Sequence, residues 1–198
     1  FKQLTGLGKA RTLKHLWQAP FTLQPNVVAG IRAEADTARA GGKGRVVAKM
    51  NSLVEPEVIN ALYEASQAGV SIDLMVRGVC ALRPGVAGLS DNIRVRSIIG
   101  RFLEHHRIFY FYAGGKENVY LSSADWMERN FFKRIELAFP ILDPKLKKRV
   151  ITEGLKFYLA DNQQGWDMNG AGAYQRRRSA RAKPHNAQGE LMITLGGG

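Results

Sequence analysis

Residues 100–112 read Gly-Arg-Phe-Leu-Glu-His-His-Arg-Ile-Phe-Tyr-Phe-Tyr, a polar segment that runs directly into an apolar and aromatic one. The apolar part predicts a buried β-strand. Two imidazoles and a guanidinium stand at its entrance. Because side chains alternate between the two faces of an extended chain, His105 and Arg107 should point one way and His106 the other. We therefore predict a His-x-Arg pair on one surface and a structural role for His106.

The His-x-Arg pair fits phosphate chemistry. An imidazole titrates near neutral pH, so it can attack phosphorus or donate a proton to a leaving oxygen. A guanidinium holds phosphate oxygens with a fixed fork of donors. The spacing alone also fits a strand that merely begins with polar residues, so the choice between these interpretations depends on the rest of the chain.

The first half of the chain predicts a helix followed by a β-α-β unit. Apolar residues recur at helical spacing over residues 26–40, and two glycines follow. The next predicted elements are a strand over 44–50, a helix over 56–68 and a strand over 70–76. The two strands of such a unit run parallel, and ligands gather where they end.

Two polar residues directly follow these predicted strands. Asn51 comes after the first strand and Arg77 after the second, so both should lie where a ligand binds. An arginine that closes a strand is often a surface ion-pair partner. A guanidinium, always charged and bidentate, also suits a phosphoryl oxygen better than lysine would.

The second half predicts more strands and one long helix. In the last strand, apolar residues alternate with others: Ile135, Leu137 and Phe139 with Arg134, Glu136 and Ala138. Asp143 supplies an N-cap for the helix, with a proline in its first turn. The predicted strands span 93–99, 118–121 and 134–141, and the helix spans 144–159.

Residues 100–112 resemble part of the C-terminal catalytic domain of bacterial polyphosphate kinases, a family with the phospholipase-D-like fold. The likeness includes Val-Tyr-Leu-Ser-Ser-Ala-Asp-Trp-Met at 119–127 and Arg-Ile-Glu at 134–136. Upstream, Lys-Met-Asn-Ser-Leu at 49–53 and Val-Arg-Gly-Val-Cys at 76–80 fit the same family in the same order. The resemblance implies an α/β fold with a phospholipase-D-like mixed sheet flanked by helices.

The resemblance also implies roles for individual residues. Arg77 stands where the family has a nucleotide- and phosphate-binding arginine. His105 matches the second of the family's two histidines, which implies proton transfer and phosphate contact. Ser123 and Asp125 occupy a small-residue segment beside that histidine, although an Asp/Ser turn that caps a helical turn over 126–129 fits them as well. The implied ATP- and phosphate-binding set is Arg77, His105, Arg107, Ser123, Asp125, Asn130 and Arg134, with His105 catalytic.

Two residues depart from the general phospholipase-D motif. Arg107 replaces its lysine, and Tyr112 stands where its aspartate would be. Both residues are compatible with the kinase branch and weaken a phospholipase or nuclease interpretation.

The implied activity is reversible transfer of the ATP γ-phosphate to inorganic polyphosphate through a phosphohistidine. The family's nucleophilic histidine and its magnesium-binding arginines are not in these residues, so this chain alone should be inactive. We find no metal cluster in the sequence, and Mg²⁺ should arrive with ATP or be held outside the chain. The implied partners are ATP or ADP, polyphosphate and the preceding domains of the same chain in a homo-oligomer, without a specific nucleic acid.

Three segments are predicted along the chain. Residues 1–20 resemble the tail of a preceding catalytic domain, residues 21–174 form the phospholipase-D-like domain, and residues 175–198 form a basic, flexible tail. The last segment is rich in arginine over 175–183, a kind of charge run that is usually solvated.

Composition supports a folded protein with anionic partners. The net charge of +12 and the pI near 10.1 favour nucleic acid, an anionic membrane face or polyphosphate. The single cysteine, Cys80, cannot form an internal disulfide. No apolar run approaches the roughly 18 residues that span a bilayer, and we do not expect the N-terminus to be a signal peptide. We expect a cytoplasmic protein, with peripheral contact to the inner membrane face left open by its charge.

Two other functions remain open from the sequence. One is a phospholipase-D-like nuclease or phosphodiesterase whose half-site is completed by dimerisation, because the fold supports both chemistries. The other is a non-catalytic module that binds polyanions through its positive charge, in which His105 has no role. Binding of the second kind weakens steeply with salt and is insensitive to the loss of one histidine.

Overall fold

The computed structural model describes residues 13–177 and 183–196. Within this part of the chain, nine strands form one sheet in the order β1-β7-β6-β5-β2-β3-β4-β8-β9. The strands are β1 (Trp17–Gln18), β2 (Arg45–Met50), β3 (Ser71–Val76), β4 (Ile93–Ile98), β5 (Ile108–Phe111), β6 (Asn118–Ser122), β7 (Leu137–Pro140), β8 (Gly165–Met168) and β9 (Tyr174–Arg176).

The sheet is mixed. β2, β3 and β4 are parallel neighbours, while β5 runs antiparallel to β2 on its other side. The predicted β-α-β unit is confirmed, and β5 and β6 form an antiparallel hairpin. Because β5 is antiparallel to β2, the start of β5 lies at the edge of the sheet where β2 and β3 end. This is the arrangement that brings the residues around His105 to the ends of the parallel strands.

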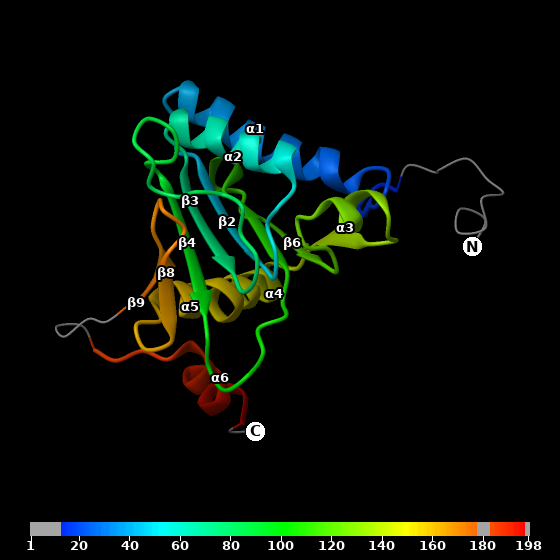
Figure 1. Cartoon of the computed structure of the whole chain (residues 1–198). Coiled ribbons are helices and arrows are strands. Elements are labelled where there is room, and N and C mark those ends of the chain that lie inside the picture. Colours follow the sequence, from blue (N-terminus) through cyan, green and yellow to red (C-terminus); the bar gives the residue numbers. More distant parts are fainter. Residues whose placement is uncertain (1–12, 178–182, 197–198) are drawn as a thin grey trace.

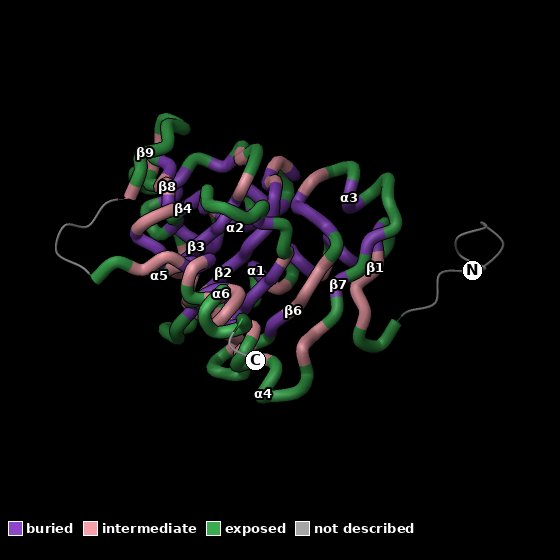
Figure 2. Tube along the Cα trace, turned by 90° about the horizontal axis from the view of Figure 1, so that it is seen from below, coloured by how far each residue is buried: buried purple, intermediate pink, exposed green. Residues whose placement is uncertain are grey.

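Helices cover both faces of the sheet (Figure 1). On one side, α1 and α2 pack on alternate residues of β2 such as Val46 and Ala48. On the other side, Val47 belongs to a smaller core with Leu155 and Tyr158. The central strands are therefore buried along most of their length (Figure 2). The helices are α1 (Leu23–Arg39), α2 (Pro56–Gln67), α3 (Glu128–Phe132), α4 (Pro144–Arg149), α5 (Phe157–Ala160) and α6 (Ala187–Gly196), with the 3₁₀ turn η1 (Ala113–Gly115) and the π-helical turn η2 (Val150–Lys156).

The long helix predicted over 144–159 is confirmed as α4, η2 and α5 in succession. Gly154 lies where this helix crosses β5. A Cβ atom at Gly154 would stand 2.5 Å from the Cδ1 of Ile108. The absence of a side chain thus lets the helix approach the sheet closely.

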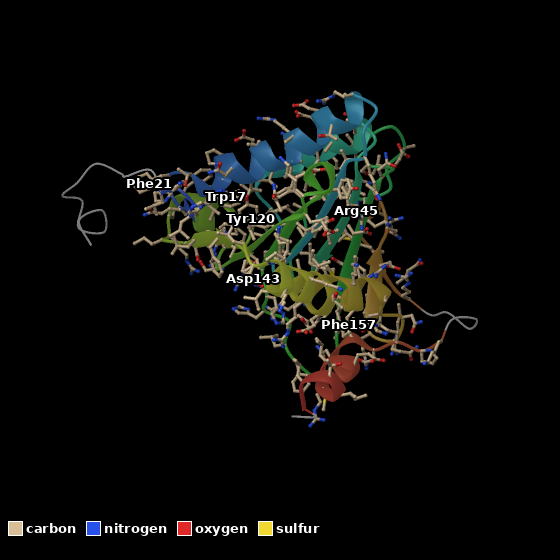
Figure 3. The ribbon with its side chains drawn as sticks, turned by 180° about the vertical axis from the view of Figure 1, so that it is seen from behind. Trp17, Phe21, Arg45, Tyr120, Asp143 and Phe157 are labelled. Carbon is tan, nitrogen blue, oxygen red and sulfur yellow. The ribbon has the colours of Figure 1, made fainter. Side chains whose placement is uncertain are left out.

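The start of α4 is capped as predicted. A side-chain oxygen of Asp143 (Figure 3) accepts a hydrogen bond of 2.8 Å from the backbone N–H of Leu146. Asp143→Ala should therefore lower the free energy of unfolding by about 1 kcal/mol, measured by urea denaturation. Asp143→Asn keeps a capping oxygen and should lose much less. Equal losses in the two variants would contradict this role.

The strand predicted over 134–141 buries the face opposite to its large apolar residues. β7 is shorter, and Ile135, Leu137 and Phe139 are 61%, 40% and 44% exposed, whereas Ala138 is fully buried. The buried side chain before the strand is Glu136, which accepts hydrogen bonds from Ser123 and Asn130. Alternation then places the apolar residues on the solvent face.

Both ends of the described chain form regular secondary structure. β1 pairs with β7, and Trp17 stacks on Tyr120 with ring centroids 3.8 Å apart (Figure 3). The flexible tail predicted over 175–198 is corrected, because α6 packs on the smaller core through Ala187. Residues 178–182, the centre of the arginine run, lie outside the described residues. None of the described helices is long and apolar enough to cross a membrane.

Candidate active site

Three segments converge where β2, β3 and β6 end. The backbone N–H of Leu53 donates to the carbonyl of Val79 at 2.9 Å, and the N–H of Trp126 donates to the carbonyl of Ser52 at 3.1 Å. Leu53 forms parallel bridges to Cys80 and to Trp126. Chain segments that are about 30 to 70 residues apart in sequence thus form one edge of the sheet.

The carboxylate of Asp125 joins two of these segments to the entrance of β5. It accepts 2.7 and 3.0 Å hydrogen bonds from the backbone and side-chain nitrogens of Asn51. It also pairs with Arg107, through Nε at 3.2 Å and Nη2 at 3.1 Å. Burial alone would raise the pKa of the Asp125 carboxyl, but the bonds from Arg107 and Asn51 outweigh burial and hold that pKa below its usual value. Asp125 is therefore an ionised anchor and not a helix cap.

Ser123 and Asn130 both bind the carboxylate of Glu136. Neither contacts the carboxylate of Asp125 directly. The Ser123 hydroxyl donates to one oxygen of Glu136, and the Asn130 amide donates to the other at 2.7 Å. The helical turn predicted over 126–129 lies slightly later, as α3. Arg134 is exposed and has no polar contact with the described residues, so the structure does not bring it into this group.

His105 lies in an extended segment just before β5. His105 is exposed. Its backbone carbonyl accepts a 3.2 Å hydrogen bond from Nη1 of Arg107. The side chains of Glu104 and His106 both reach Lys49, with Nζ at 2.7 Å from Oε2 of Glu104 and 3.3 Å from Nδ1 of His106. The alternation expected from the sequence is thus seen on both sides of His105. Its imidazole has no polar or ring contact with the described part of the chain.

Lys49 is the centre of a buried polar cluster that the sequence did not reveal. It is 3% exposed, and its Nζ lies 3.1 Å from the ring centroid of Tyr158. Burial lowers the pKa of Lys49 to about 8, against the opposing effect of Glu104. Burial would raise the pKa of Glu104, but the hydrogen bond from His106 and the charge and hydrogen bond of Lys49 lower it to about 2. The sequence did contain one signal for this cluster, which is a lysine within the otherwise apolar strand Val-Val-Ala-Lys-Met.

Arg77 closes this cluster on the side of β3. It lines a small cavity together with Lys49, Glu104 and His106. Its Nε is buried and has no hydrogen-bond partner among the described residues. A buried guanidinium donor without a partner is costly unless an anion or water satisfies it. The position predicted for Arg77, directly after β3, is confirmed.

The donors at this edge of the sheet suit an anion and not a metal. Among residues 13–177 and 183–196, no group of three or more His, Cys, Asp or Glu side chains is arranged to hold a metal ion. The carboxylates found here are already engaged, Asp125 by Arg107 and Asn51 and Glu104 by Lys49. The edge therefore presents an unpaired guanidinium donor and an exposed imidazole, a combination that binds phosphate oxygens and moves protons.

The fold is that of phospholipase-D-like proteins. Nuc of Salmonella typhimurium, a phospholipase D family member, superposes with a TM-score of 0.55 at 17% identity, over 78% of this chain and 96% of that protein. At this identity the likeness concerns the fold alone.

Within that fold class, the chain belongs to the family described as polyphosphate kinase C-terminal domain 2, whose model matches residues 16–188. It is 66% identical to the polyphosphate kinases of Paraburkholderia phytofirmans and Burkholderia cenocepacia over 97% of its length. The crystal structure of polyphosphate kinase from Porphyromonas gingivalis superposes with a TM-score of 0.93 at 38% identity, over 99% of this chain and 30% of that one. The chain spans 28% of the length of the two curated relatives.

Proposed function

We propose that this chain is the C-terminal half-site of a polyphosphate kinase that reversibly transfers the ATP γ-phosphate to inorganic polyphosphate. One observation carries the proposal. In a chain 66% identical to a polyphosphate kinase, Arg77 and His105 lie at the same edge of the sheet, with a buried donor of Arg77 left unpaired. The phosphohistidine forms on a nucleophile in a preceding domain, outside these residues.

The residues of this half-site have distinct tasks. Arg77 directs its unpaired guanidinium donor to the oxygens of the transferring phosphate, and His105 exchanges a proton with the attacking or leaving oxygen. Arg107 is largely committed to Asp125, so its main task is to hold the segment that carries His105. Ser123 and Asn130 support this edge through Glu136. Arg134 contacts phosphate only if the bound polymer reaches the surface where it lies.

In this proposal, Mg²⁺ enters the site bound to ATP. It neutralises phosphate charge when it is bound, but the carboxylates here are held by Arg107, Asn51 and Lys49. The described residues therefore do not fit a resident metal site, and its ligands lie in other domains. A homo-oligomer in the cytoplasm, with ATP or ADP, polyphosphate and the preceding domains as partners, completes the proposal.

The test compares the isolated 198-residue chain with the longer kinase that contains it. Both are incubated with ATP and Mg²⁺, and polyphosphate is measured. We expect polymer from the longer protein and none from the isolated chain, because a half-site lacks the nucleophile. Polymer made by the isolated chain would overturn the half-site assignment. Metal-independent cleavage of DNA by a dimer of the isolated chain would favour the nuclease alternative.

A further inference from the structure

The C-terminal helix α6 is fastened to the segment that leads into His105, although the two are more than 80 residues apart (Figure 1). The contact is made by Gln188, which is 5% exposed. Its Oε1 accepts a 2.9 Å hydrogen bond from the backbone N–H of Phe102, and its Nε2 donates to the carbonyl of Phe102 at 2.7 Å. One amide side chain thus holds both polar backbone groups of a residue three positions before His105.

The same amide also orients Glu104. Nε2 of Gln188 donates to Oε1 of Glu104 at 2.6 Å, while Oε2 of Glu104 accepts from Nζ of Lys49 at 2.7 Å. Each oxygen of the carboxylate is therefore held by a different donor. With His106 held against Lys49 and Glu104 as well, the residues before and after His105 are pinned to one face of the chain. Alternation then directs His105 away from that face.

The backbone opposite Gln188 is adapted to this contact. A Cβ atom at Gly100 would stand 2.4 Å from Oε1 of Gln188, so close that the amide would have to move. A side chain at this position would therefore displace the amide from its contact with the backbone of Phe102. The close approach indicates that the position of the amide is specific.

We propose that Gln188 is a positioning residue for His105, so that the C-terminal helix is part of the working half-site. This inference rests on the proposed function. Gln188 acts through Phe102 and Glu104 and does not itself contact the phosphates.

The chain around Gln188 has anchors of its own, so the amide can be removed without releasing the helix. The N–H of Ala187 donates to Oδ2 of Asp161 at 2.8 Å. Asn162 and His185 exchange two further hydrogen bonds, of 3.1 and 2.9 Å. Gln188→Ala should therefore leave the helix in place and free only the segment around Phe102.

The first experiment measures polyphosphate synthesis by the longer kinase with Gln188→Ala. Because misplacement of a reacting group by about 1 Å costs up to about a hundredfold, we expect kcat to fall by roughly 10- to 100-fold with KM for ATP nearly unchanged. Gln67→Ala is the matched control, since Gln67 is exposed and makes one hydrogen bond to a carbonyl on another surface. Wild-type kcat in Gln188→Ala would overturn the proposal.

A second variant gives a readout that loss of stability alone does not produce. Gln188→Glu places a carboxylate against Glu104, which also contacts Lys49. His106 and Tyr158 lie at the same place. Two adjacent carboxylates repel when both are ionised and can share a proton at lower pH. Activity relative to wild type should thus be lowest near pH 8 and rise toward pH 6, whereas the ratio for Gln188→Ala stays flat. A flat ratio for both variants counts against the proposal.

Hydrogen exchange separates this inference from the proposed function. In Gln188→Ala, the amide of Phe102 should exchange faster while amides of β2 and β3 keep their wild-type rates. If the wild-type kinase makes no polymer, the proposed function fails, and the exchange rates still decide whether Gln188 holds this segment. Unchanged exchange at Phe102 would refute the positioning role in either case.

Discussion

Replacing His105 with alanine in the longer kinase should lower the rate of ATP-dependent polyphosphate synthesis by about a hundredfold or more. A positioned proton-transfer group contributes a factor of roughly 10² to 10⁴. His105 is an exposed residue just before β5, at the end of the sheet where β2 and β3 also end and where Arg77 follows β3. The imidazole that lines the small cavity of Arg77 is that of His106. Because the side chain of His105 makes no polar contact with the described residues, its removal should not change the melting temperature. The measurement is kcat at equal concentrations of folded enzyme.

Two comparisons make this result specific. His105→Asn keeps a polar side chain that cannot titrate near neutral pH, so its loss should be nearly as large. His15→Ala, which removes another exposed imidazole, should behave like wild type. Near-normal synthesis by His105→Ala would leave the fold standing but remove His105 from the chemistry. It would then favour the interpretation in which positive charge alone binds the polyanion.

The sequence predicts those parts of the fold that depend on local patterns. The β-α-β unit follows from apolar periodicity, and the position of Arg77 follows from the end of β3. Asp143 was found as a cap because Asp-Pro is a local signal. The face of β7 could not be predicted from its own residues, since it is set by Glu136, whose partners Ser123 and Asn130 come from elsewhere in the chain.

In the site, too, local features could be predicted from the sequence, whereas contacts between distant segments could not. Alternation around His105 is a property of an extended chain, and the structure keeps it in Glu104 and His106 on one side and Arg107 on the other. The partners could not be predicted, because Lys49 comes from β2 and Gln188 from a segment that composition marks as solvated. The composition of residues 175–198 reflects their average polarity. It does not identify the few residues of this segment that pack on the domain.

Asp125→Ala should lower the free energy of unfolding by about 3–5 kcal/mol, the usual effect of removing one partner of a buried ion pair. The side chains of Asp125 and Arg107 are only 9% and 15% exposed. Its removal leaves the charge of Arg107 and two donors of Asn51 without an acceptor. Urea denaturation of the 198-residue chain measures the loss. Asp125→Asn keeps one carbonyl oxygen and should lose less.

The pH dependence of this loss follows from the sign of the pKa shift. The pKa of Asp125 is lowered in the folded state, so its contribution is present above the usual carboxyl pKa and disappears as the pH falls through the folded-state pKa. The difference between wild type and Asp125→Ala should therefore shrink below about pH 4. Asp36→Ala removes an exposed carboxylate paired with Arg39 and should change stability by less than about 0.5 kcal/mol. If Asp125→Ala costs no more than Asp36→Ala, Asp125 is not the anchor that joins Asn51 to the segment of His105.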